Sequence, residues 1–336
     1  MRTEFCDLLG IDVPLVQAPI GGAAVPELAA AVSNAGALGT VTLTGRSGEA
    51  ALDMIRQTRK LTSRPFNANF ILAYEGQFEE PLDVALQEKV PVVNLFWGDP
   101  GPYVDRVHAA GSLLMAQLSS VEEARHAADC GVDIIVAQGF GAGGHVKGDS
   151  ALLPLVANIV KEVSTVPVLA SGGITDGRGL AAVLALGAAG AYIGTRFLVA
   201  EEASVPPEYV ERLLEAGISD TVYTTLFDRG WPEAPHRALR NSTYQAWVRA
   251  GRPPRDQRPG KDDIVATDAS GYEVHRYESY TPTAGVKGNI EALAMWAGQG
   301  VGLVTHVQPA GEIVREIDEE ALRVIQALAA RLEQVR

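Results

Sequence analysis

Residues 133–145 read DIIVAQGFGAGGH, a short apolar run that leads directly into a glycine-rich loop ending on His145. Such a run is typical of a strand covered on both faces, as in parallel sheets. Glycines let a backbone approach a bulky planar ligand, at an entropic cost that a plain connector has little reason to carry. A histidine at the rim of such a loop can exchange a proton near neutral pH. The stretch therefore predicts a cofactor site with an acid–base group beside it.

The same strand-then-helix pattern recurs on both sides of this stretch, and eight apolar runs alternate with helix-like segments. Alternation of this kind indicates parallel strands joined by crossover helices. Eight units favour an α/β fold closed into a (β/α)₈ TIM barrel over an open doubly wound sheet. The predicted strands are residues 15–18, 37–43, 66–72, 90–96, 112–118, 133–138, 166–171 and 190–194.

The pattern breaks after the eighth unit, which predicts three parts. Residues 1–218 would form the barrel, and residues 219–284 a small helical insertion or lid over its mouth. Residues 285–336 would form C-terminal helices that pack back on the barrel, with helical patterns at 285–303 and 318–335. Residues 229–261 hold seven Arg and one Lys against two acids, a local balance of +6 in a chain of net charge -13.

Composition excludes several classes of protein. The chain has 336 residues, of which 47% are hydrophobic, enough for a large core. Its acidity argues against nucleic acid and anionic membranes as partners. No apolar run reaches the ~18 residues of a membrane span, and the N-terminus lacks the apolar core of a signal peptide. Two cysteines are too few for a disulfide framework or a zinc site. We therefore expect a cytoplasmic enzyme, either a monomer or a homodimer.

Amides and glycines dominate the C-terminal ends of the predicted strands, where barrel enzymes place their active sites, and carboxylates are nearly absent. Two neighbouring loops, Ser171 to Gly173 and Gly194 to Thr195, fall where phosphate-binding barrels hold an anion. The alternative is that these glycines only permit tight turns. The candidate residues at these strand ends are Ala18, Pro19, Ile20, Asn69, Gln138, Gly143, Gly144, Ser171, Gly172, Gly173, Gly194 and Thr195.

His145 is the one histidine of six that follows glycines at a strand end, so it is the candidate catalytic residue. No H-x-x-x-H spacing pairs it with another ligand, which argues against a metal. Residues 139–144 match G-x-G-x-x-G formally, but no helix opens there, so we reject a dinucleotide fingerprint. The chain has no G-x-S-x-G elbow and no lysine at a strand end. We expect that an organic cofactor with a phosphate tail, and not a side chain, carries out the reaction itself.

Taken together, the strand-end motifs resemble the nitronate monooxygenase family, formerly called 2-nitropropane dioxygenases. The resemblance implies a TIM barrel, residues 1–218, that binds FMN non-covalently, with Ala18 to Ile20 against the flavin. Many members have methionine where this chain has Ile20, a change expected to alter flavin packing more than chemistry. The motifs are residues 17–22, 67–70, 137–139, 142–145, 170–174, 194–197 and 297–300, and RALRN at 237–241 adds to them.

By the same resemblance, His145 would act as a base on a nitroalkane or orient the anionic nitronate. The nitronate would be oxidised with O₂ to a carbonyl compound and nitrite. The implied contacts with FMN are Asn69, Gln138 and Gly143, together with Gly144, Ser171 and Gln299 from the same motifs. The implied contacts with its phosphate are Gly172, Gly173, Gly194 and Thr195.

Two other functions stay open at this point. FMN-dependent enoyl-[acyl-carrier-protein] reductases and NADH:quinone reductases share this scaffold and use a nicotinamide as electron donor. In that case the basic segment 229–261 could bind the phosphates of NAD(P)H, coenzyme A or an acyl-carrier partner, or it could be a solvated lid. A phosphate-binding barrel without flavin, such as a lyase or isomerase, is a more remote alternative. This chain lacks the strand-end lysine or carboxylates that those reactions use. The physiological substrate is left open.

Overall fold

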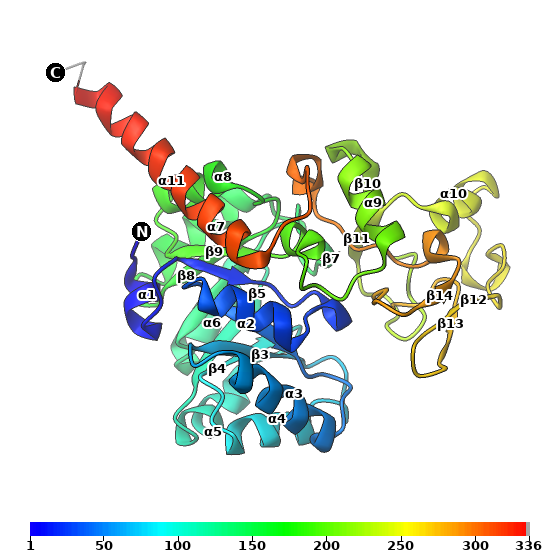
Figure 1. Ribbon diagram of the computed structural model, residues 1–336, viewed down its shortest axis with the longest axis horizontal. Helices are drawn as coiled ribbons and strands as arrows, with labels where there is room; N and C mark the ends of the chain where they lie inside the picture. Colours follow the sequence, from blue (N-terminus) through cyan, green and yellow to red (C-terminus); the bar gives the residue numbers. More distant parts are fainter. Residues whose placement is uncertain (334–336) are drawn as a thin grey trace.

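The computed structural model describes residues 1–333, and its eight-stranded parallel sheet forms the barrel seen at the left of Figure 1. The strands follow one another in the order β1-β9-β8-β6-β5-β4-β3-β2. The Gln17 amide donates to the Leu38 carbonyl at 3.0 Å, which joins β1 to β2 and closes the ring. The predicted TIM-barrel class is therefore confirmed. Its strands are β1 (Leu15–Gln17), β2 (Gly39–Thr42), β3 (Phe66–Ile71), β4 (Val92–Phe96), β5 (Leu113–Leu118), β6 (Ile134–Gln138), β8 (Val168–Ser171) and β9 (Gly190–Ile193).

Helices cover the outside of the barrel, and the eighth of them comes from the end of the chain. The C-terminal helix α11 (Ala310–Glu333) packs against α8 and α2 and buries Ile313, Val314 and Ile317. The insertion therefore lies inside the eighth strand–helix unit, between β9 and α11. The other helices of this layer are α2 (Pro26–Asn34), α3 (Gly48–Leu61), α4 (Glu79–Gln87), α5 (Val104–Ala109), α6 (Val121–Cys130), α7 (Leu152–Glu162) and α8 (Gly177–Ala185).

The period of two along each strand decides which side chains enter the barrel. In β6, Ile134 and Val136 pack in the interior, whereas Ile135 and Ala137 pack against the helices. The next inward position is Gln138, at the C-terminal end of the strand. The N-terminal end is closed by α1 (Glu4–Leu9), whose Phe5 is fully buried in the same interior cluster. In β6 the polar inward position thus lies at the end of the barrel where enzymes of this fold react.

The insertion, at the right of Figure 1, is not the helical lid that the sequence predicts. Residues 219–284 hold one α-helix, α10, and strands of two small antiparallel sheets. One sheet joins β10 and β11 to β7 of the barrel loop, and the other joins β12 and β13 to β14, just after residue 284. Aromatic and β-branched residues favour these short strands. The elements are β7 (Gly144–His145), α9 (Pro207–Glu215), β10 (Thr221–Thr224), β11 (His236–Leu239), α10 (Ser242–Arg249), β12 (Ile264–Thr267), β13 (Glu273–His275) and β14 (Lys287–Gly288).

The predicted helix at 285–303 is also wrong. The segment contains β14 and two single 3₁₀ turns, Ile290–Ala292 and Gln299–Leu303. The reason is its glycines, because Gly285 and Gly288 have φ values of 88° and 132°, which no right-handed helix contains. The helix predicted at 318–335 begins earlier, at Ala310, and its predicted last residues lie outside the described part of the chain. Among residues 1–333 no helix is long and apolar enough to cross a membrane. The boundaries at 218 and 284 stay predictions.

Candidate active site

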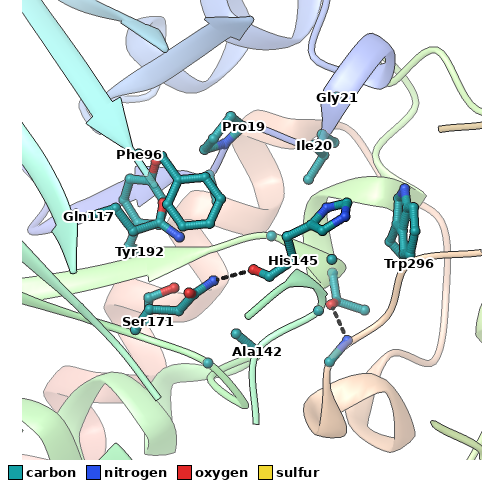
Figure 2. A pocket seen from close by; sticks show the side chains of 18 of the residues that line it. Pro19, Ile20, Gly21, Phe96, Gln117, Ala142, His145, Ser171, Tyr192 and Trp296 are labelled. Atoms are coloured by element: carbon teal, nitrogen blue, oxygen red, sulfur yellow. Dashed lines mark hydrogen bonds between the residues drawn. The ribbon is translucent and has the colours of Figure 1, made fainter. Parts of the chain in front are cut away.

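A cavity of about 1160 Å³ lies at the C-terminal ends of the barrel strands, where the insertion covers them. Its lining combines glycines, amides and aromatic side chains from the barrel and from the chain that follows it. Figure 2 shows Phe96, Gln117 and Tyr192 on one side of the cavity and Trp296 on the other, with His145 between them. The barrel contributes the first group, and the insertion with the segment after it contributes Trp296.

Buried amides form the floor of the cavity. Gln138 donates from Nε2 to the His145 carbonyl at 2.9 Å, but its Oε1 has no partner among the described residues. Gln117 Oε1, which lines the same cavity, is likewise buried without a partner among the described residues. Each such atom costs about 1–3 kcal/mol if it stays unsatisfied. The floor therefore fits a ligand whose edge carries N–H donors.

Glycines build a cradle at one end of the cavity. Gly172 and Gly173 follow β8 with φ values of 117° and 74°, and Gly194 and Thr195 follow the neighbouring strand β9. A Cβ on Gly172 would lie 2.9 Å from the Ala142 nitrogen, so only glycine fits there. Within residues 1–333 the backbone N–H groups of these four residues donate no hydrogen bond. Unpaired N–H groups from two adjacent loops are an arrangement of the kind that binds phosphate in other proteins.

His145 lies on β7, which is held in place by the insertion. Its backbone pairs antiparallel with His236 of β11. The imidazole stacks on Trp231 with ring centroids 4.0 Å apart, and its Nε2 lies 3.4 Å from Ser279 Oγ. Burial, with a smaller effect of nearby His236, lowers the pKa of His145 well below its ordinary value of 6.5. The ring is therefore neutral at neutral pH.

The cavity carries no charged side chain among the described residues that line it. Among the described lining residues the ionisable groups are His145, Tyr74 and Tyr192. Burial raises the pKa of both tyrosines, so both are neutral phenols. A lining of this kind has no carboxylate pair and no lysine to carry acid–base or Schiff-base catalysis. The described residues also contain no group of His, Cys, Asp and Glu that could hold a metal.

The structure brings nearly all of the predicted site residues together around this cavity. Gln299 is the exception, because its backbone N–H donates to the Gly141 carbonyl at 2.9 Å while its neighbours Gly298 and Gly300 line the cavity instead. The predicted residues that line it are Ala18, Pro19, Ile20, Asn69, Gln138, Gly143, Gly144, His145, Ser171, Gly172, Gly173, Gly194 and Thr195.

Several lining residues are not among those predicted. Gln117 could have been found, because it follows the inward-facing Met115 by two positions, as Gln138 follows Val136. No local signal exists for the residues that the insertion and the segment after it bring over the barrel mouth. Those lining residues are Trp231, Ser279, Thr281 and Trp296.

Comparison with known proteins gives consistent results. The family model described as nitronate monooxygenase matches residues 2–80 and 71–320. A nitronate monooxygenase of Pseudomonas aeruginosa is 32% identical, over 95% of this chain and 99% of that protein. FabK from Thermotoga maritima is similar in structure, with a TM-score of 0.84 and 30% identity over 98% of this chain and 99% of that one. A nitroalkane oxidase from Streptomyces ansochromogenes has a TM-score of 0.77 and 30% identity, over 96% and 99% of the two chains. With its cavity formed at the strand ends where the motifs lie, this chain belongs to the nitronate monooxygenase family.

Proposed function

We propose that this protein is a flavin-dependent nitronate monooxygenase that holds FMN and oxidises alkyl nitronates, with O₂, to carbonyl compounds and nitrite. The observation that carries the proposal is the uncharged cavity, which runs from a glycine cradle to a neutral histidine. The family and the nitroalkane oxidase neighbour support the same chemistry.

The residues present fit FMN. Gly172, Gly173, Gly194 and Thr195 would hold the phosphate with backbone N–H groups that have no other described partner. The unpaired Oε1 atoms of Gln117 and Gln138 would accept N–H groups at the edge of the flavin ring, and Asn69, Gly143, Gly144 and Ser171 line the same space. Ala18, Pro19 and Ile20 would lie against the ring. When bound, the flavin supplies the redox chemistry that takes electrons from the nitronate.

His145 would position the substrate. A neutral imidazole donates one N–H, so it can hold a nitronate oxygen, and the Ser279 hydroxyl lies close enough to assist. A base of lowered pKa has less driving force for removing a carbon-bound proton. We therefore infer that preformed nitronates are better substrates than neutral nitroalkanes, although His145 is the residue in the cavity that could accept that proton.

An anaerobic visible spectrum tests the proposal. The purified protein should show a flavin spectrum that a nitronate reduces and that NADH and NADPH leave unchanged. A colourless protein that also rejects added FMN would contradict it and would instead indicate a flavin-free phosphate-binding barrel.

A second candidate is a reductase that uses NAD(P)H as electron donor. One observation favours it, a basic cavity in the insertion close to the active site. Bleaching of the flavin by NADH or NADPH in the same experiment would support this function. Location in the cytoplasm and a monomeric or homodimeric state stay predictions.

A further inference from the structure

The arginines of the basic segment 229–261 have different surroundings in the structure. Arg237 covers an aromatic ring, with its guanidinium carbon 4.7 Å from the Phe140 ring centre. Arg229, Arg255 and Arg258 line a second cavity of about 810 Å³. Its charged lining residues are the cations Arg229, Arg255, Arg258, Lys261 and Arg276 and the acids Asp228, Asp256 and Asp262. Five cations against three acids leave a balance of +2 in a protein of net charge -13.

Three of the cations are paired with acids, Arg258 with Asp228, Lys261 with Asp262 and Arg276 with Asp263, and Arg255 lies 3.8 Å from Asp228. Arg258 binds Asp228 through two N–H···O contacts of 2.8 and 3.1 Å, and this pair consumes the buried carboxylate. Arg258 is nine-tenths buried, and its Nε has no partner among the described residues. Arg229 forms no ion pair with any residue between 1 and 333. Partly buried guanidinium groups without a full set of acceptors favour an anionic ligand.

Backbone hydrogen bonds connect this cavity to the wall of the active site. Arg229 and Tyr277 line the basic cavity, whereas Trp231 and Ser279, two positions further along, line the active-site cavity. The Arg229 N–H donates to the Tyr277 carbonyl at 3.0 Å, and the Ser279 N–H donates to the Arg229 carbonyl at 2.9 Å. Two residues of chain span at most about 7 Å, even when fully extended. One elongated ligand could therefore reach both cavities.

We propose that the basic cavity binds the diphosphate of a nucleotide-type ligand whose other end enters the active site. The planar forks of the arginines match phosphate oxygens, and the lysine adds a point charge. Both a nicotinamide dinucleotide and a coenzyme A thioester carry this diphosphate. The site goes beyond nitronate oxidation, because a small nitronate has no group that would reach it.

Calorimetric titration of the flavin-loaded protein with NADPH, NADH, coenzyme A and inorganic pyrophosphate tests the proposal. The variant Arg229→Gln/Lys261→Gln should bind the preferred ligand at least ~10-fold more weakly, because each charge-assisted hydrogen bond contributes at least that much. The matched control is Arg249→Gln, an exposed arginine of the same segment that does not line the cavity. It should bind like the wild type. Flavin content and melting temperature verify that the variants fold.

The four ligands also identify the source of the diphosphate. Tight binding of NADPH or NADH but not coenzyme A assigns the site to a nicotinamide dinucleotide, and the reverse assigns it to a thioester. Binding of pyrophosphate alone would overturn the proposal, because pyrophosphate has no second part that could enter the active site. So would the absence of binding by any ligand below about 1 mM, or equal affinity in the wild type and the double variant. Nitronate turnover by the wild type is measured separately, so its failure would refute the proposed function and not this site.

Discussion

Acidification should destabilise this protein through His145 and His236, two histidines whose pKa burial lowers, and the contribution of His236 can be worked out. The side chain is 0% exposed on β11, the strand that pairs with β7. Its Nε2 accepts the Phe227 N–H at 3.2 Å, and its Nδ1 lies 2.9 Å from the Ala234 carbonyl. These two contacts assign the proton of the neutral ring to Nδ1. Protonating Nε2 would place an N–H against an N–H, in addition to burying a charge.

The magnitude follows from the pKa of this group. Burial lowers the pKa of His236 from 6.5 to about 4. The unfolded chain therefore takes up a proton below pH 6.5, whereas the folded chain does so only near pH 4. The contribution to stability is present in full above pH 6.5 and disappears as the pH falls to 4. Its total is about 3 kcal/mol, of which about 2 kcal/mol is lost at pH 5.

Urea unfolding at pH 7, 6 and 5 with excess flavin, for the wild type and His236→Asn, measures this contribution. The variant should be less stable at pH 7, because the Phe227 N–H loses its acceptor, but its free energy of unfolding should fall less steeply with pH. The difference in free energy of unfolding between the two proteins should therefore be about 2 kcal/mol smaller at pH 5 than at pH 7. His306→Asn, at an exposed histidine, should run parallel to the wild type. Parallel curves for wild type and His236→Asn would refute the reasoning.

Three further predictions concern the cavity. His145→Ala should retain flavin but lose at least ~10²-fold in turnover of neutral nitroalkanes, measured by nitrite release, and undiminished turnover would contradict its role. Gly173→Asp should weaken flavin retention, measured by the flavin-to-protein absorbance ratio, because it adds negative charge at the cradle. Gly173→Ala shares the backbone strain at φ 74° without the charge, so equal flavin loss in both would argue against a phosphate site. Ser279→Ala removes the hydroxyl 3.4 Å from His145 Nε2 and should lower kcat/KM for a nitronate by ~3- to 10-fold, with flavin content unchanged.

Most of the barrel could be predicted from the sequence because its determinants are local. Each strand is a short apolar run, and the period of two also fixes which strand-end side chains turn inward. Asn69 and Gln138 stand at predicted strand ends, and the period of two applied to β5 adds Gln117. The glycine cradle was predictable for a related reason, because the C-terminal ends of adjacent parallel strands meet at one edge of the sheet.

The insertion could not be predicted in the same way, because its structure depends on pairing between distant segments. Trp231 and Trp296 reach the cavity from parts of the chain without clear periodicity. The aromatic, proline and arginine content indicates an irregular segment but does not distinguish short strands from helices. The misplaced helix at 285–303 has a simpler cause, since apolar spacing suggested a helix and the glycine conformations excluded it.

The placement of His145 shows why the two parts of the chain form one site. Strand β7 has only two residues, and a strand so short has no stability of its own. Its conformation is fixed by the register His236 to His145 and Arg237 to Gly144, which joins the barrel loop to a hairpin about ninety residues later in the sequence. The barrel supplies the cradle and the amide floor, and the insertion fixes the distance of the imidazole from them. A substitution that loosens the β10–β11 hairpin should therefore reduce turnover while leaving flavin bound, although it touches no lining residue.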